Sequence, residues 1–126
     1  MAHNDVAGLR SVLIADDDPR VRAALRVFLG AHGQIDVVEE AATSGDALAI
    51  AQARRPAVAI VDLHLPGLDQ GLALLQTLTG ELGIPALAIS LDVNARQSAL
   101  DAGAYMFIDK VSVSERLVDA LALALR

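Results

Sequence analysis

Two kinds of hydrophobic pattern alternate along this chain. Short runs rich in Val, Ile, Leu and Ala predict β-strands at residues 11–15, 35–38, 57–61, 86–89 and 105–108. The run at 57–61 is apolar without alternation, as expected for a strand that is buried on both faces. The longer segments between these runs repeat their apolar residues at helical spacing, so a helix is expected after each strand.

The first predicted helix has clear boundaries. Pro19 suits its first turn, Asp18 is a favourable N-cap, and the glycines within 30–33 mark its end. Four residues at helical spacing are expected to form its buried face: Val21, Leu25, Phe28 and Leu29.

The later helices are marked by start and stop signals. One begins at Ser44 and is ended by Pro56, a third follows the loop "LPGLDQG", and a fourth covers about 93–103. The last begins with Ser112 and Glu115, which have the spacing of a capping box. On the second helix, Leu48 and Ala51 are expected to face inward, and on the third helix Leu72, Leu75 and Leu78. The inward residues of the last helix are expected to be Val113, Leu117, Leu121 and Leu125.

This alternation predicts the α/β class, as a three-layer, doubly wound, five-stranded parallel sheet with helices on both faces and right-handed crossovers. Folds of this kind bind ligands or react at the carboxyl ends of their strands. Candidate functional residues should therefore lie where the predicted strands end.

Acidic, hydroxyl and basic side chains occur at these strand ends. The central candidates are Asp16 and Asp17 after the first strand, Asp62 after the third, Ser90 after the fourth and Lys110 after the fifth. The second strand ends in Glu39 and Glu40, but it is expected at the sheet edge, away from the centre. The sequence thus predicts that three acids, one hydroxyl and the only lysine converge on one rim.

Composition narrows the class of protein. The 126 residues suit one domain, and a hydrophobic fraction of 54% excludes a disordered chain. The net charge is −6 and the basic residues are not clustered, so direct contact with nucleic acid is not expected. No apolar run is long enough to cross a membrane, no signal pattern is present, and the absence of cysteine fits a cytoplasmic protein.

Neighbouring carboxylates beside a low-dielectric core repel one another unless a cation lies among them. Asp18 is interpreted as a helix cap, and Asp16 with Asp17 alone would more often be a solvated loop than a metal site. The addition of Asp62 on the neighbouring strand favours a divalent metal.

The stretches "VLIADDDP", "VDLHLPGLD", "AIS" and "AGAYMFIDK" resemble, in this order, the receiver domain of two-component response regulators, the CheY-like superfamily. The resemblance extends from about Ser11 to Leu125, which predicts a tail at 1–10 and a receiver domain at 11–126. It implies a flavodoxin-like sheet with strand order 2-1-3-4-5. The residue after Lys110 is Val111, where many relatives have Pro. In this feature the chain resembles receivers attached to LuxR/NarL-type DNA-binding domains.

The resemblance also implies roles for individual residues. Asp62 takes the place of the phosphoacceptor, with Ser90 and Lys110 as the switch hydroxyl and the lysine that contact the phosphoryl group. Mg²⁺ (or Mn²⁺) would be held by Asp17 directly, by Asp16 through water, by Asp62 and by the backbone carbonyl of His64. Phe107 takes the place of the switch aromatic, and a role in the core is equally compatible with its position. The side chain of His64 is expected to be exposed.

The implied function is a signalling domain, not an enzyme in the usual sense, that catalyses its own phosphorylation and dephosphorylation. A sensor histidine kinase would transfer a phosphoryl group to Asp62, and the face formed by the fourth helix, fifth strand and fifth helix would be repacked. That face would control an output domain or a downstream protein, or would mediate a phosphorylation-dependent homodimer.

Two other functions remain open at this point. One is a receiver-like scaffold or interaction module that is never phosphorylated; the other is a metal-dependent phosphatase with an aspartyl nucleophile, although such enzymes usually have a second acid where this chain has His64. The segment "LDQGLALL" carries an extra residue, Gln70, relative to the family, and the segment 90–103 is shorter than usual. Both differences flank the predicted site and affect the surface expected to be recognised.

Overall fold

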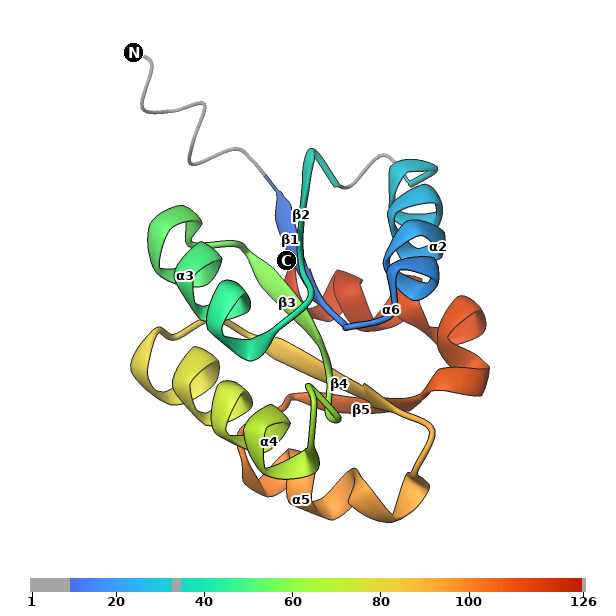
Figure 1. Cartoon of the computed structure of the whole chain (residues 1–126). Coiled ribbons are helices and arrows are strands. Elements are labelled where there is room, and N and C mark those ends of the chain that lie inside the picture. Colours follow the sequence, from blue (N-terminus) through green and yellow to red (C-terminus); the bar gives the residue numbers. More distant parts are fainter. Residues whose placement is uncertain (1–9, 33–34, 126) are drawn as a thin grey trace.

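A computed structural model describes residues 10–32 and 35–125 of the chain. Its five strands form one parallel sheet in the order β2-β1-β3-β4-β5, as predicted (Figure 1). The strands are β1 (Ser11–Ala15), β2 (Val37–Ala41), β3 (Val58–Asp62), β4 (Ala86–Ser90) and β5 (Met106–Asp109).

Helices cover both faces of the sheet and give a three-layer structure (Figure 1). On one face lie α2 (Pro19–Gly30) and α6 (Val113–Ala124), and on the other lie α3 (Ser44–Arg54), α4 (Leu68–Gln76) and α5 (Arg96–Asp101). The end of α4 continues as a π-helical turn (Thr77–Glu81), and short 3₁₀ turns precede α5 (Val93–Ala95) and α6 (Lys110–Ser112). The predicted α/β doubly wound fold is confirmed.

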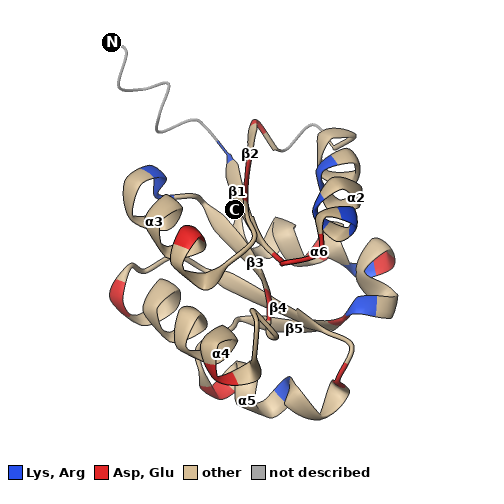
Figure 2. Ribbon diagram, in the orientation of Figure 1, with Lys and Arg blue, Asp and Glu red and all other residues tan. Residues whose placement is uncertain are grey.

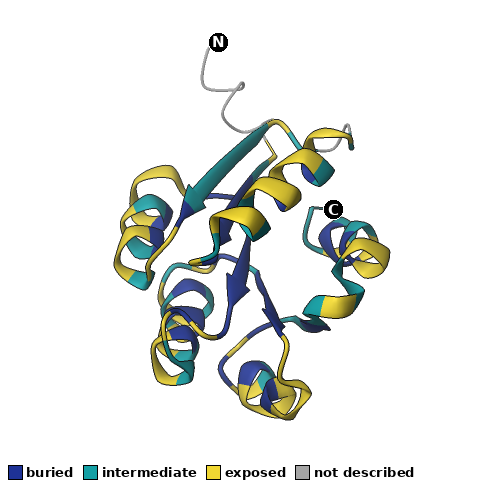
Figure 3. Cartoon of the chain, turned by 45° about the vertical axis from the view of Figure 1, so that its right-hand side comes forward, coloured by how far each residue is buried: buried dark blue, intermediate teal, exposed yellow. Residues whose placement is uncertain are grey.

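The core consists of two layers, because successive side chains of a strand point to opposite faces of the sheet. Val12 and Ile14 pack with α2 and α6, whereas Leu13 and Ala15 pack with α3, α4 and α5. The central strands are buried along their whole length (Figure 3). This apolar support holds the carboxyl ends of β1, β3, β4 and β5 rigidly side by side.

The edge strand differs from its prediction: β2 covers Val37–Ala41 rather than residues 35–38. Glu39 and Glu40 therefore lie inside the strand, in register with Leu13 and Ile14, instead of following it. Arginines from the flanking helices pair with both glutamates, which makes charged residues acceptable on a half-covered edge strand. The first strand has the predicted bounds, β3 and β5 lie one residue later than predicted, and β4 is one residue longer. Asp62 and Ser90 are therefore the last residues of β3 and β4.

The predicted cap of α2 is confirmed, whereas the predicted capping box before α6 is wrong. Asp18 caps α2 by accepting a 2.9 Å hydrogen bond from the backbone N–H of Arg20, with Pro19 in the first turn. The capping box at Ser112 does not form, since the Ser112 side chain makes no cap hydrogen bond. The chain already turns at Lys110–Ser112, where Asp109 accepts from the amide of Val111 and caps that turn instead.

The beginning of α4 packs closely against the end of β3. Gly71 is buried in α4, and a Cβ at this position would collide with the backbone carbonyl of Leu63. Gly71 therefore permits α4 to approach the residue that follows Asp62. Gln70 lies in the first turn of α4, before this contact.

Candidate functional site

The carboxyl ends of four strands bring together the side chains predicted from the sequence. Asp16 and Asp17 follow β1, Asp62 ends β3, Ser90 ends β4 and Lys110 follows β5. A cavity of about 310 Å³ opens at this point, lined by Asp17, Asp62, His64, Pro66, Ser90, Leu91, Asp92 and Lys110. The predicted convergence on one rim is therefore observed.

The three aspartates form one acidic cluster. One oxygen of each of Asp16, Asp17 and Asp62 lies within 4.8 Å of the others. Asp16 is fully buried and Asp62 is 5% exposed, whereas Asp17 is exposed at the mouth of the cavity. Carboxylates at this separation repel one another strongly in a buried setting.

The donor set of this cluster fits a hard divalent cation, which prefers carboxylate and carbonyl oxygens together with water. Oδ2 of Asp16 has no well-directed hydrogen bond although it is buried. Nζ of Lys110, 3.0 Å away, offsets the charge of this oxygen. Water bound to a cation would supply the hydrogen bond that the oxygen lacks.

Lys110 supplies positive charge within the cluster. Its Nζ lies 3.0 Å from Oδ2 of Asp16 and 3.3 Å from Oδ2 of Asp62. Burial by itself lowers the pKa of Lys110, but the neighbouring carboxylates of Asp16 and Asp62 outweigh it and raise this pKa above its ordinary value. Lys110 is thus a permanent cation between two aspartates.

Asp62 is held in a defined orientation. Its Oδ1 accepts a 3.2 Å hydrogen bond from the backbone N–H of His64, and its Oδ2 faces Lys110. Burial, together with the negative charge of Asp16, raises the pKa of Asp62, although the His64 amide and Lys110 partly offset this rise. The charged form of Asp62 is therefore disfavoured in the folded protein relative to the unfolded chain.

Asp16 is fixed through both its side chain and its backbone. Its Oδ1 accepts a 2.9 Å hydrogen bond from the amide of Asp18, and its own amide donates to the carbonyl of Ala41 at 3.0 Å. Its carbonyl accepts a 2.7 Å hydrogen bond from Nη1 of Arg22. Arg22 was not among the predicted residues, because it lies on a helix whose predicted role was to cover the sheet.

Ser90 is fully buried at the end of β4, and its Oγ accepts a 2.9 Å hydrogen bond from the amide of Asp92. This bond uses an oxygen lone pair, so the hydroxyl hydrogen can be donated to another acceptor. Asp92 also lines the cavity and had not been singled out from the sequence.

Two other predicted residues lie at different depths. Phe107 is 3% exposed and belongs to the core layer beneath α3, α4 and α5. The His64 side chain is exposed at the cavity mouth, as expected. His32 follows the end of α2, and its Nδ1 lies 2.8 Å from the carbonyl oxygen of Phe28 in that helix. His3 and most of the predicted tail lie outside the described residues.

The fold and the acidic cavity are those of a response regulator receiver domain. Residues 12–122 match the family model for the response regulator receiver domain, so the chain belongs to this family. It is a receiver domain of the kind found in two-component response regulators. Among the described residues, no helix is both long and apolar enough to span a membrane.

Relatives and solved structures agree with this assignment. The chain is 35% identical over 117 residues to the transcriptional regulatory protein KdpE of Mycobacterium tuberculosis, covering 91% of this chain and 50% of that protein. It is 37% identical over 120 residues to the C4-dicarboxylate transport transcriptional regulatory protein DctD of Pseudomonas aeruginosa, covering 90% of this chain and 25% of DctD. This chain therefore spans half or less of the length of these two relatives.

Crystal structures of receiver domains superpose closely on the chain. The receiver domain of NtrX from Brucella abortus matches with a TM-score of 0.80 and 30% identity, covering 90% of this chain and 97% of that one. A CheY-like receiver domain protein from Methanospirillum hungatei matches with a TM-score of 0.81 and 27% identity, covering 93% of this chain and 94% of that one.

Proposed function

We propose that Asp62 accepts a phosphoryl group from a phosphohistidine of a sensor histidine kinase, and that this switches the chain between two states. The observation that carries the proposal is the position of the Asp62 carboxylate, which lies at a cavity mouth between Lys110 and the acidic pair Asp16 and Asp17. The His64 amide and Lys110 hold the Asp62 carboxylate in one orientation, and its charged form is disfavoured in the folded protein. A phosphoryl group or a cation that binds this carboxylate would relieve that unfavourable charge.

In the transfer step, a carboxylate oxygen of Asp62 forms a bond to phosphorus while the bond between phosphorus and the kinase imidazole nitrogen breaks. The imidazole leaves with that electron pair and takes up a proton. Lys110, which contacts Oδ2 of Asp62, would hold one phosphoryl oxygen, and the buried Ser90 hydroxyl would donate to another.

Asp17 and Asp62, with Asp16 through water and the backbone carbonyl of His64, would hold Mg²⁺ or Mn²⁺. When bound, the dication supplies positive charge between the attacking carboxylate and the anionic phosphoryl group. Asp16 contributes by orienting Lys110 and by keeping its buried charge next to the site.

The phosphorylated state would be recognised on the α5, β5 and α6 face. Ser90 and Lys110 would move toward the phosphoryl oxygens, and this movement would repack the segments that follow β4 and β5. Phe107 already lies in the core of this structure, so we propose that its ring supports the repacked face from beneath. The partner would be an output domain, a downstream protein or a second copy of this chain.

Phosphorylation of the purified chain tests this function. Incubation with Mg²⁺ and acetyl phosphate should add one phosphoryl group, measured by intact-protein mass, and Asp62→Asn or an excess of chelator should prevent the addition. Asp69→Asn, an exposed carboxylate in the first turn of α4, is the matched control and should be phosphorylated like the wild type. A wild-type chain that acquires no phosphoryl group and binds no Mg²⁺ would instead favour a receiver-like scaffold.

A further inference from the structure

The peptide group that joins Asp16 to Asp17 is held from outside the acidic cavity. Nη1 of Arg22 donates a 2.7 Å hydrogen bond to the oxygen of this peptide group, the carbonyl of Asp16. The preceding peptide group is held as well, because the amide of Asp16 donates to the carbonyl of Ala41 at 3.0 Å. Arg22 lies one turn into α2, and its side chain is only 18% exposed. A charged donor with so little solvent around it makes a stronger hydrogen bond than one at the surface.

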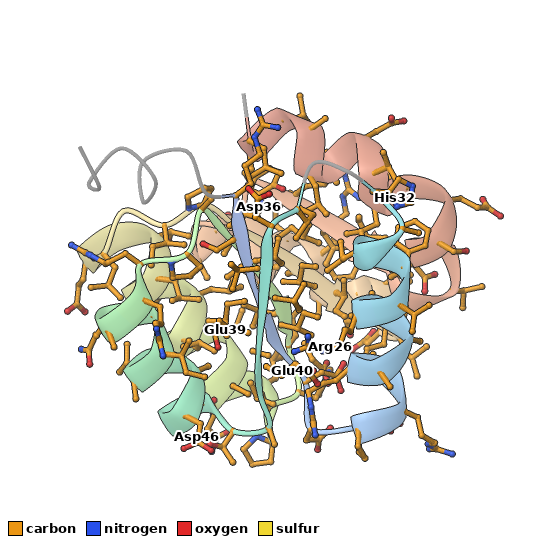
Figure 4. All side chains as sticks on the ribbon, turned by 90° about the horizontal axis from the view of Figure 1, so that it is seen from above. Arg26, His32, Asp36, Glu39, Glu40 and Asp46 are labelled. Atoms are coloured by element: carbon orange, nitrogen blue, oxygen red, sulfur yellow. The ribbon has the colours of Figure 1, made fainter. Side chains whose placement is uncertain are left out.

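Arg22 is itself oriented by the edge strand. Its Nε donates a 3.2 Å hydrogen bond to Oε1 of Glu40 in β2, and Arg26, one turn later in α2, pairs with Oε2 of the same carboxylate. Figure 2 shows basic positions along α2 facing acidic ones on β2, and Figure 4 shows Arg26 beside Glu40 between these two elements. The planar guanidinium of Arg22 thereby engages Glu40 and the Asp16 carbonyl at once, which the single ammonium of a lysine does less well.

The Asp17 carboxylate lacks a comparable support. Within residues 10–32 and 35–125, no hydrogen bond or ion pair to the Asp17 side chain is found, and this side chain is exposed. Its direction therefore depends on the backbone from which it projects. Because the Asp16 carbonyl lies in the same peptide plane as the Cα of Asp17, a donor that fixes this carbonyl restricts the position from which the Asp17 side chain projects.

We propose that Arg22 is a positioning residue for the cation site: it clamps the Asp16–Asp17 peptide so that the Asp17 carboxylate is directed toward Asp62 before any cation binds. This inference rests on the proposed function, since it concerns the same site. It assigns Arg22 a role distinct from that of Arg26, which pairs with Glu40 and donates to the carbonyl of Val38 in β2. In the part of the chain that the structure describes, Arg26 has no hydrogen bond to the backbone of Asp16 or Asp17.

Arg26 supplies the matched control, because both arginines tie α2 to β2 through Glu40 and only Arg22 reaches Asp16. We expect Arg22→Gln to weaken Mg²⁺ binding about tenfold, the lower end for loss of a group that orients metal ligands. Arg22→Lys should recover part of this loss, and Arg26→Gln should bind Mg²⁺ like the wild type. The dissociation constants are measured by isothermal titration calorimetry on the full chain, with circular dichroism as the check on folding.

Phosphorylation by acetyl phosphate at increasing Mg²⁺ gives an independent readout. With Arg22→Gln, the Mg²⁺ concentration for half-maximal rate should rise with the dissociation constant, whereas the rate at saturating Mg²⁺ should approach that of the wild type. If Arg22 only stabilised the fold, Arg22→Gln and Arg26→Gln would both lower stability. The Mg²⁺ concentration for half-maximal rate would then not rise selectively in Arg22→Gln.

The outcomes separate the two proposals. Equal Mg²⁺ affinity in wild type and Arg22→Gln, or an equal loss in Arg22→Gln and Arg26→Gln, overturns the role of Arg22 and leaves the proposed function intact. If the wild type binds no Mg²⁺, both proposals fail. Should Arg22→Gln not fold, Arg22→Lys and Glu40→Gln decide the matter: each should weaken Mg²⁺ binding in the same direction, and wild-type affinity in both overturns the inference.

Discussion

The ammonium nitrogen of Lys110 lies 3.0 Å from Oδ2 of Asp16, an oxygen that is buried and has no well-directed hydrogen bond. These two residues are separated by most of the chain, and their contact joins the segment after β5 to the end of β1. The contact offsets the charge of a fully buried aspartate, and it holds Lys110 next to Asp62.

Replacing Lys110 with methionine should destabilise the protein by about 2 kcal/mol or more, because removal of one partner leaves a buried charge without compensation. Denaturant unfolding without metal measures the change. Lys110→Arg, which keeps the charge, is the control and should lose less. A methionine variant as stable as the wild type would show that Asp16 does not depend on this cation.

Asp62→Asn should stabilise the protein near neutral pH in the absence of metal, because burial and the charge of Asp16 raise the pKa of Asp62. For an acid with a raised folded pKa, the wild type is at its most stable relative to the variant below the unfolded pKa, at about pH 4. Its relative stability falls as the pH rises through the folded pKa. The advantage of asparagine should therefore appear at neutral pH and disappear in acid.

Thermal unfolding of wild type and Asp62→Asn across this pH range, with chelator present, checks the sign. Asp119→Asn, which removes an exposed carboxylate on α6, is the control for the loss of a surface charge. Addition of Mg²⁺ should stabilise the wild type by about 2.7 kcal/mol at a hundredfold excess over its dissociation constant. A metal-free wild type that exceeds Asp62→Asn in stability at neutral pH would contradict the prediction.

Gly71→Ala should destabilise the protein by about 1–3 kcal/mol and reduce phosphorylation of Asp62, because the added Cβ collides with the Leu63 carbonyl beside the end of β3. Gly80→Ala is the matched control, since a Cβ at Gly80 meets no atom within 4 Å. That substitution should be neutral or slightly stabilising. Urea unfolding of both variants compares them, and equal effects would show that α4 can move away from β3 freely.

Tyr105 is the only tyrosine of the chain, so its ionisation can be followed directly by ultraviolet absorbance. Burial raises its pKa to about 12, and its hydroxyl donates a 2.8 Å hydrogen bond to the carbonyl of Ala120 in α6. The stability that follows from this shift is fully present below about pH 10, the ordinary tyrosine pKa. It is lost as the pH rises toward 12. Titration with an ordinary midpoint in the folded protein would show that α6 does not cover this ring.

The sequence by itself determined the order of elements and the chemistry at the strand ends. Apolar runs and helical spacing follow from the geometry of strands and helices, which is local, and they predicted five strands with intervening helices. Parallel strands place their carboxyl ends at one edge, so Asp16, Asp17, Asp62, Ser90 and Lys110 could be expected together before any distance was known.

Only the tertiary structure decided how each of these residues is used. Asp16 and Asp17 are neighbours in sequence and their carboxylates belong to one cluster, yet Asp16 is fully buried and Asp17 is exposed. This difference in burial arises from the elements packed around the end of β1, which the sequence does not show. The glutamates inside β2 are paired with arginines of α2 and α3, and these contacts form only when the helices pack beside the strand. The cap before α6 likewise comes from Asp109 at a turn that no residue pattern indicated. The contact between Arg22 and the Asp16 carbonyl also could not be predicted from the sequence. Every residue has a backbone carbonyl, so the residue type at position 16 does not indicate that its carbonyl accepts a hydrogen bond from an arginine.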